Sequence, residues 1–195
     1  MSEAASSNIS GTISTDRRYT LAIQVDNESG VLSQVSRLFS RKGYNIESLA
    51  VGPTDVSSVS RITIEVLTSD QSATLLCNQL RKLLPVHSVK LLEPTKMLRR
   101  ELVLYKVRAV TSDERNEVIQ IASIFRGQII DVSSETLTIS LIGEEEKTDA
   151  AQMLLREFGI IELVRTGMIA LERGHYTIDE KTKEKGEFDY GKHVL

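Results

Sequence analysis

The segment around which the chain is organised reads Asn27-Glu28-Ser29-Gly30-Val31-Leu32-Ser33. It follows an alternating apolar run over residues 19–25, typical of a strand with one covered face, and precedes a run with helical spacing over residues 31–39. The segment is therefore predicted to be the turn between a strand and a helix. Gly30 allows backbone to approach a guest closely, and the first amides of a helix have no partner inside the helix. Such N–H groups, at the positive end of the helix dipole, suit a carboxylate.

Two asparagines supply acceptors for a positive charge. Asn27 lies in the turn, and Asn45 lies in a second stretch that reads Gly43-Tyr44-Asn45-Ile46-Glu47-Ser48. Each can offer a side-chain carbonyl to an ammonium group, so the turn and the asparagines together would hold both charged ends of a free amino acid. In the alternative interpretation, Ser29 or Asn27 caps the helix and Gly30 only eases the turn. The spacing by itself leaves both interpretations open.

Length and composition indicate a globular protein of one large or two small domains, and the repeat described below favours two. The chain has 195 residues, of which 41% are hydrophobic and 26% charged. Its formal net charge of −3 gives no reason to expect nucleic acid or an anionic membrane as a partner. No apolar run reaches the roughly 18 residues of a membrane span. Cys77 is the single cysteine, which excludes a disulfide framework, favours a reducing compartment and predicts a small buried side chain.

The two ends of the sequence differ in composition from the rest. Residues 1–17 are rich in Ser, Ala, Thr and Asn and lack an apolar centre, which predicts a disordered lead-in and not a secretory signal. We therefore expect a cytoplasmic protein, or a plastid or mitochondrial one if the lead-in is the remnant of a trimmed transit peptide. Residues 173–195 mix acids with Lys and Arg and hold few aliphatic side chains, which predicts a mobile or partner-dependent tail.

The periodicity of the chain predicts the same order of elements twice. In the first half, strands are expected over residues 19–25, 45–51, 62–66 and 86–92, with helices over residues 30–42 and 70–83. In the second half, strands are expected over residues 102–110, 128–133, 136–142 and 160–171. The helices of that half are expected to open at a capping box, Thr111-Ser112-Asp113-Glu114, and at Glu144. Each half thus has the order βαββαβ.

This order predicts an α+β fold of two tandem ferredoxin-like βαββαβ domains, each an antiparallel sheet with both helices on one face. The domains are expected over residues 18–93 and 99–172, with a linker over residues 94–98. A small sheet with two open edges has a marginal core, and pairing the edges of two copies would remedy both problems. The second strand, with Asn45, lies at an edge in this topology. We therefore expect a homodimer that brings the 27–33 turn near its symmetry mate.

Several stretches resemble the small, regulatory subunit of acetolactate (acetohydroxyacid) synthase, which begins with an ACT domain. In the first half these are the 27–33 segment, Gly43-Tyr44-Asn45-Ile46-Glu47-Ser48-Leu49 and Ser60-Arg61-Ile62-Thr63-Ile64. In the second half they are Phe125-Arg126-Gly127-Gln128-Ile129-Ile130-Asp131-Val132 and Arg165-Thr166-Gly167-Met168-Ile169-Ala170-Leu171. The resemblance runs from about residue 18 to residue 174. It implies an effector-binding, dimerising ACT domain over residues 18–93 and a C-terminal ferredoxin-like domain.

The resemblance also implies a regulatory role without chemistry of its own. The family's catalytic subunit uses thiamine diphosphate, Mg²⁺ and FAD in the entry step to valine, leucine and isoleucine synthesis. The small subunit activates it and confers feedback inhibition by a branched-chain amino acid, usually valine, so no cofactor or metal is expected on this chain. The positions that match the family's effector site are Asn27, Gly30 and Asn45, with Val31, Leu32 and Ser33 alongside them. Leu32, Ile46 or Leu49 would form the apolar wall, and Ala50 and Gly52 are weaker matches.

The residues themselves disfavour catalysis. His87, His175 and His193 are scattered and lack metal-ligand spacing, and no nucleophile elbow, phosphate-binding loop or dinucleotide fingerprint is present. One alternative is a stand-alone amino-acid-sensing ACT protein that acts on another partner, although no helix-turn-helix or basic stripe indicates DNA. A second alternative is a small enzyme of the ferredoxin-like fold, which would require a cluster of titratable groups.

Overall fold

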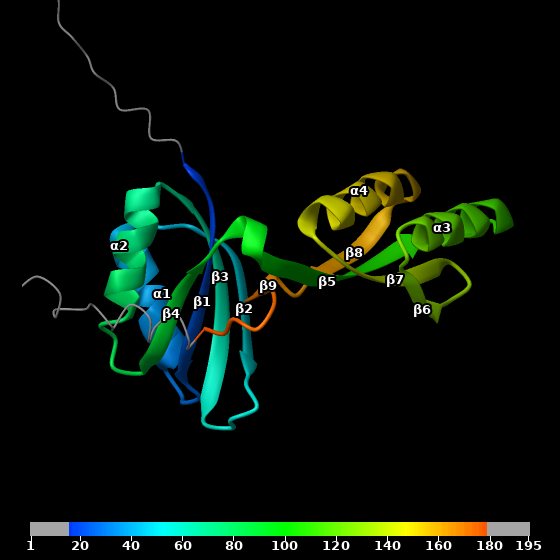
Figure 1. The fold of residues 1–195 in the computed structure, drawn as a ribbon. Helices are drawn as coiled ribbons and strands as arrows, with labels where there is room; N and C mark the ends of the chain where they lie inside the picture. Colours follow the sequence, from blue (N-terminus) through cyan, green and yellow to red (C-terminus); the bar gives the residue numbers. More distant parts are fainter. Residues whose placement is uncertain (1–15, 179–195) are drawn as a thin grey trace, which may run out of the picture.

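Residues 16–178 are described in the structure, a computed structural model, and form two units that lie side by side (Figure 1). The N-terminal unit consists of β1 (Arg17–Asp26), α1 (Val31–Lys42), β2 (Ile46–Pro53), β3 (Val59–Thr68), α2 (Asp70–Leu80) and β4 (Val86–Leu92). The C-terminal unit consists of β5 (Met97–Arg108), α3 (Ser112–Ile124), β6 (Gln128–Val132), β7 (Thr136–Gly143), α4 (Glu145–Leu155), β8 (Ile160–Arg165) and β9 (Ile169–Glu172). Short 3₁₀ turns, η1 (Pro94–Lys96) and η2 (Arg156–Phe158), precede β5 and follow α4.

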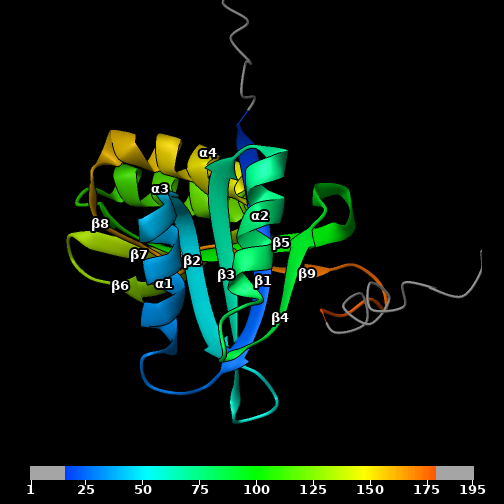
Figure 2. The same cartoon turned by 90° about the vertical axis from the view of Figure 1, so that its left-hand side faces the viewer.

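The N-terminal sheet has the strand order β2-β3-β1-β4, so β2 lies at an edge as predicted. Each strand is antiparallel to its neighbours. Both helices cover the same face, and Figure 2 shows α1 and α2 in front of the sheet. The largest fully buried side chains of this core come from β1, β3 and both helices: Leu21, Ile23, Ile62, Ile64, Phe39, Leu76 and Leu80. Burial of a side chain of this size contributes roughly 2 kcal/mol, which makes this layer the main source of stability in the unit.

The C-terminal sheet repeats this plan with the order β6-β7-β5-β8 and with α3 and α4 together on one face (Figure 1). The predicted capping box opens α3: the Glu114 amide donates to Thr111 Oγ1 at 3.2 Å, and the Glu114 carboxylate accepts from the Thr111 amide at 2.9 Å. Hydrogen bonds from the Thr111 and Val110 amides lower the pKa of Glu114. The predicted fold class, two tandem antiparallel βαββαβ units, is confirmed.

Strand β5 joins the two units. Its first four residues pair with β9, whereas the rest of the strand pairs with β7 and β8. Strand β9 crosses the face of the N-terminal sheet that α1 and α2 leave uncovered (Figure 1). There the Ala170 carbonyl accepts a hydrogen bond from the Arg61 guanidinium at 2.8 Å. Glu172 forms an ion pair with Lys90 of β4, and the two side chains are only 4% and 8% exposed.

The prediction of one continuous strand over residues 160–171 is wrong. Residues Thr166–Met168 separate β8 from β9, and Gly167 between them has a left-handed φ of 78°. The break lets the two strands serve different parts of β5, since β8 pairs with residues 103–107 and β9 with residues 97–100. An apolar run cannot reveal this change of partner, because apolar residues continue through both β8 and β9.

Other boundaries move by a few residues. β5 begins at Met97, not Leu102, so Met97 and Leu98 of the predicted linker are strand residues. Asn45 precedes β2 instead of lying within it, and α2 ends at Leu80. Cys77 is buried in the N-terminal core as predicted.

The predicted tail is ordered at its beginning. Ile178 is 5% exposed and packs with Ala22 and Leu92 on the open face of the N-terminal sheet. The remainder of the predicted tail, residues 179–195, and nearly all of the predicted lead-in, residues 1–15, lie outside the described residues.

Candidate functional site

The predicted turn forms an uncapped helix start. Helix α1 begins at Val31, and its N-cap is Gly30, which has φ 87° and ψ −12°. No side chain accepts a hydrogen bond at this cap, so the alternative in which Ser29 or Asn27 caps the helix is wrong. A Cβ at Gly30 would meet no atom within 4 Å, which shows that the space in front of the cap is open.

Two helix amides face this opening without an acceptor. The amides on either side of them are used, since Val31 donates to the Glu28 carbonyl at 3.4 Å and Gln34 donates to the Gly30 carbonyl at 3.1 Å. The Leu32 and Ser33 amides have no acceptor among residues 16–178. Because these donors lie at the positive end of the helix dipole, they can bind a carboxylate.

Each predicted asparagine is oriented by its own NH₂ group. Asn27 Nδ2 donates to the Ser57 carbonyl at 2.9 Å, and Asn45 Nδ2 donates to Glu47 Oε1 at 2.6 Å. No donor reaches either side-chain carbonyl within the described part of the chain. Since an amide holds its donor and acceptor on opposite branches, both carbonyl oxygens are available to accept from an ammonium group.

The two asparagines lie at opposite ends of the N-terminal sheet. Ile46, next to Asn45, is level with Val66 of β3, whereas the Asn27 amide donates to the Ser58 carbonyl just before that strand. Val66 and Ser58 are eight residues apart, or about 27 Å at roughly 3.4 Å per strand residue. One chain therefore cannot bring both carbonyls to one free amino acid.

The remaining predicted site residues divide between these two ends. Val31 is buried in the core, so its side chain cannot contact a ligand at the turn, whereas Leu32 is 41% exposed. Ser33 is exposed beside it. Ile46 is partly buried and packs against the N-terminal core. The structure thus groups the 27–33 residues and separates them from Asn45 and Ile46.

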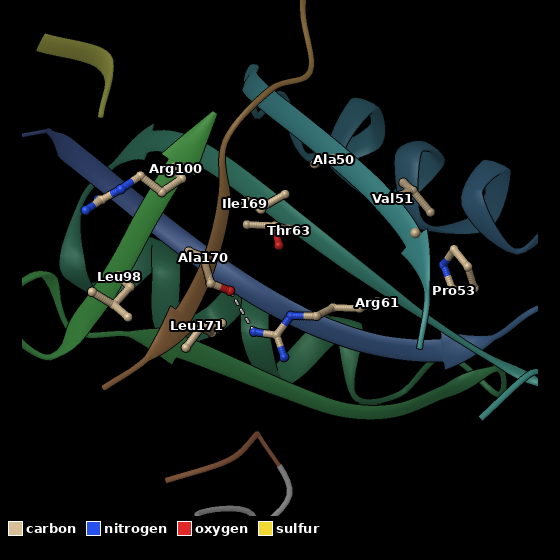
Figure 3. Close-up of a pocket in the computed structure, with 11 residues that line it drawn as sticks. Ala50, Val51, Pro53, Arg61, Thr63, Leu98, Arg100, Ile169, Ala170 and Leu171 are labelled. Atoms are coloured by element: carbon tan, nitrogen blue, oxygen red, sulfur yellow. Dashed lines mark hydrogen bonds between the residues drawn. The ribbon is translucent and has the colours of Figure 1, made fainter. Parts of the chain in front are cut away.

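An apolar cavity of about 480 Å³ lies between β2 and β9 (Figure 3). It includes the weaker predictions, Ala50 and Gly52, but none of the seven main ones. Its two arginines are engaged, since Arg61 bonds the Ala170 carbonyl and Arg100 Nη1 bonds Glu144 at 2.7 Å. None of its eleven described lining residues is acidic, so an ammonium group would find no counter-charge there. The cavity is a poor match for a zwitterion.

A polar region between the units has no counterpart among the sequence predictions. Glu65 of β3, 2% exposed, lies 3.4 Å from Arg99 Nε of β5 and 3.8 Å from Arg18 of β1. Both arginines also pair with Glu145, at the start of α4. A polar cavity of about 360 Å³ adjoins this cluster, and its lining includes Glu47, Ser48, Leu49, Glu101, Arg165 and Gly167. Of these residues only Leu49 has a predicted role, as an apolar wall of the effector site, and the charged residues are distinguished only by their long-range pairing.

Two further findings concern the described residues as a whole. No group of three or more His, Cys, Asp or Glu side chains between residues 16 and 178 is placed to hold a metal ion. No helix in that range is both long enough and apolar enough to cross a membrane.

The fold and the turn together define a class: a tandem ferredoxin-like protein whose first unit has an uncapped helix start suited to a small anion. Comparison with known proteins identifies the family. Residues 21–88 match the family described as the AHAS small subunit-like ACT domain, and residues 100–174 match the family described as the small subunit of acetolactate synthase.

Relatives agree over most of the chain. The acetolactate synthase small subunit of Haemophilus influenzae is 44% identical over 162 residues, which cover 83% of this chain and 99% of the relative. The probable small subunit of Methanothermobacter thermautotrophicus is 42% identical over 160 residues, covering 82% and 95%. The crystal structure of the small subunit from Thermotoga maritima has a TM-score of 0.77 at 34% identity, covering 82% of this chain and 99% of that one. The chain belongs to the acetolactate synthase small-subunit family, as its motifs predict.

Proposed function

We propose that this chain is the regulatory subunit of an acetolactate synthase and that it confers feedback inhibition by a branched-chain amino acid, most commonly valine in this family. The observation that supports this most directly is the uncapped start of α1, where the Leu32 and Ser33 amides face open space beside Asn27. A carboxylate on these amides and an ammonium group on asparagine carbonyls would account for recognition of a free amino acid.

The effector site is completed by a second copy of the chain. Strand β2 is an edge strand, and its antiparallel pairing with β2 of a second copy would place the beginning of one strand beside the end of the other. The end of β2, at Pro53, is level with Ser60 and so with the 27–33 turn of the same chain. The turn of one copy would therefore lie beside Asn45 and Ile46 of the other. A homodimer thus resolves the distance that separates the two halves within one chain.

Apolar contacts at this junction favour a branched side chain. Leu32 is 41% exposed at the turn, and Ile46 is partly buried at the start of β2. A hydrocarbon pocket separates side chains that differ by one methylene by only about 1–3 kcal/mol. We therefore expect valine, leucine and isoleucine to compete for the site, with affinities that differ by a limited factor.

The catalytic partner would supply the chemistry. Thiamine diphosphate, Mg²⁺ and FAD are assigned to that subunit, and this chain acts by binding it and by changing its activity with effector occupancy. The assignment of the ACT domain to residues 18–93 and of the C-terminal domain to residues 99–172 is part of this proposal. We infer a cytoplasmic location from the single cysteine, Cys77, which suits a reducing compartment.

The test is reconstitution with the catalytic subunit. Synthase activity is measured with and without this chain, across a titration of L-valine, and calorimetry measures valine binding to this chain alone. We expect higher activity with the chain present and inhibition at valine concentrations near the calorimetric Kd. A chain that binds valine but neither associates with the synthase nor changes its activity would instead be the stand-alone sensor.

A further inference from the structure

A short loop of the C-terminal unit rests directly on β2. This loop, Thr166–Met168, is called the coupling loop here. A Cβ at Gly167 would lie 2.8 Å from the Leu49 carbonyl oxygen and 3.1 Å from Ser48 Oγ, closer than a side chain tolerates. The Met168 amide donates a hydrogen bond to Ser48 Oγ at 2.7 Å. Two features favour glycine here: the φ of 78° strains any other residue, and the close approach to β2 leaves no room for a Cβ.

The coupling loop is fixed to the rest of the C-terminal unit. The Thr166 amide donates to the Leu102 carbonyl at 3.1 Å, and Thr166 Oγ1 accepts from the Leu102 amide at the same distance. Arg165, just before the loop, bonds Glu101 of β5 at 2.9 Å and Gln152 of α4 at 2.7 Å. A displacement of the loop would therefore be shared by β5 and α4.

The other side of the contact is close to the proposed effector site. Ser48 follows Asn45 by three residues in the same extended segment, and Asn45 is bonded to Glu47 at 2.6 Å. Glu47 and Ser48 line the polar cavity between the units together with Glu101 and Arg165. A continuous series of contacts thus runs from the Asn45 side chain, just before β2, through Glu47 and Ser48 of β2 to the coupling loop.

We propose that the coupling loop transmits effector occupancy from the start of β2 to the C-terminal unit. This inference rests on the function proposed above. Engagement of the Asn45 carbonyl by an ammonium group would shift the beginning of β2, and the Ser48–Met168 hydrogen bond and the Gly167 contact would report that shift to β5 and α4. Ser48 and Gly167 are positioning residues, since neither would touch the effector. Because coupling is reciprocal, a loosened contact would also weaken the effect that the C-terminal unit and its partner have on effector affinity.

The first measurement uses the whole chain without its partner. Hydrogen exchange of the peptide that spans residues 166–172 is compared with and without saturating L-valine, and calorimetry establishes occupancy. We expect valine to change exchange in this peptide, because the Met168 amide is the donor in the contact. If valine binds but hydrogen exchange of this peptide does not change, the proposed role of the coupling loop is overturned and the proposed function is left intact. Absence of valine binding would overturn both.

The second measurement uses the reconstituted synthase and matched variants. Ser48→Ala removes the acceptor, and Gly167→Ala introduces a Cβ against the Leu49 carbonyl. Ser48→Thr keeps a hydroxyl, and Gly174→Ala imposes the same backbone strain at φ 75°, where a Cβ meets nothing within 4 Å. We expect the first two to raise the half-inhibiting valine concentration by about tenfold, within the usual range of allosteric coupling, while activation without valine is unchanged.

The control variants decide between coupling and general damage. Ser48→Thr and Gly174→Ala should be inhibited like the parent protein. The proposal would be overturned if synthase reconstituted with Ser48→Ala or Gly167→Ala were inhibited at the same valine concentration as with the parent protein. The proposal would also be overturned if both variants lost activation as well as valine inhibition while their circular dichroism and thermal midpoint stayed unchanged. The contact would then serve binding of the catalytic subunit.

Discussion

Asn27 and Asn45 lie at opposite ends of the N-terminal sheet, beside Ser58 and Val66, which are about 27 Å apart at roughly 3.4 Å per strand residue. If both contact one effector molecule, they come from different chains. This arrangement can be tested by mixing two variants that are each expected to lose valine binding, Gly30→Asp and Asn45→Ala. A mixed dimer combines two damaged halves in one site and leaves the other site intact. With random exchange, about a quarter of all sites should recover, because half of the dimers are mixed and each has one intact site of two.

The measurement is calorimetric valine binding after the two variants are mixed, unfolded and refolded together. Each variant treated alone in the same way is the control and should show no binding at the concentration used. A mixture that binds no more than its components would contradict a site shared between chains.

The charge at the turn gives a second prediction. Gly30→Asp introduces a carboxylate where the effector carboxylate would meet the Leu32 and Ser33 amides. Asp tolerates a left-handed backbone, so the fold should be retained. We expect loss of valine inhibition in the reconstituted synthase with activation largely kept.

Gly30→Asn is the matched control for this charge, because it has nearly the same size and the same tolerance of the left-handed conformation. It should weaken inhibition less than Gly30→Asp does. Equal loss in both variants would indicate that bulk, not charge, disturbs the site. Unchanged inhibition in Gly30→Asp would exclude the turn from the effector site.

The alternating pattern of β1 correctly predicts which face is buried in the core, but it incorrectly predicts that the other face is exposed to solvent. The alternation that ends at Val25 places Leu21 and Ile23 in the core, as found. It also implies a solvated opposite face, yet Thr20 and Ala22 are 2% and 0% exposed. The cover of Ala22 includes Ala170 of β9, about 150 residues later in the sequence, whereas Thr20 donates a hydrogen bond to the buried Glu65. Periodicity reports the nearest layer of packing and does not report a second layer.

The candidate site shows the same division between local and distant information. The separation of Gly30 from Asn45 follows from the sequence, because a twelve-residue helix between them spans about 18 Å. The uncapped helix start does not follow from the sequence, since Ser29 and Asn27 are good capping residues by type. The contact between Ser48 and Met168 joins residues 120 positions apart, and neither residue type signals it. Only the resemblance to a family singles out the segment that contains Met168.

The buried ion pair between the units gives a third prediction. Lys90 and Glu172 are 8% and 4% exposed, so Glu172→Gln leaves the buried Lys90 ammonium without this carboxylate, although Lys90 Nζ still donates to the Thr177 carbonyl at 2.8 Å. We expect Glu172→Gln to lower the free energy of unfolding by about 3–5 kcal/mol. Urea denaturation measures this change. Glu162→Gln is the matched control, because the Lys106–Glu162 pair is largely exposed and should cost less than about 1 kcal/mol.

A double variant separates the pair from general packing. Lys90→Met combined with Glu172→Leu replaces both charges by apolar side chains of similar size and should recover most of the loss. Equal destabilisation of the double and single variants would show that these side chains stabilise the interface by contacts other than their mutual attraction.

Tyr105 gives a prediction about alkaline stability. Burial beneath α4 raises the pKa of its phenol from 10.0 to about 12, and the hydroxyl donates to the Thr148 carbonyl at 2.8 Å. A raised pKa means that the folded state retains the proton longer than the unfolded state. The contribution of Tyr105 to stability is thus complete below pH 10, declines between pH 10 and about 12, and is lost above that.

Tyr105→Phe should cost about 1 kcal/mol at neutral pH through the lost hydrogen bond, but the stability of the variant should decline less steeply above pH 10. Urea midpoints for both proteins from pH 8 to the alkaline limit of the fold measure this difference, and parallel curves would show that the phenol does not ionise on unfolding.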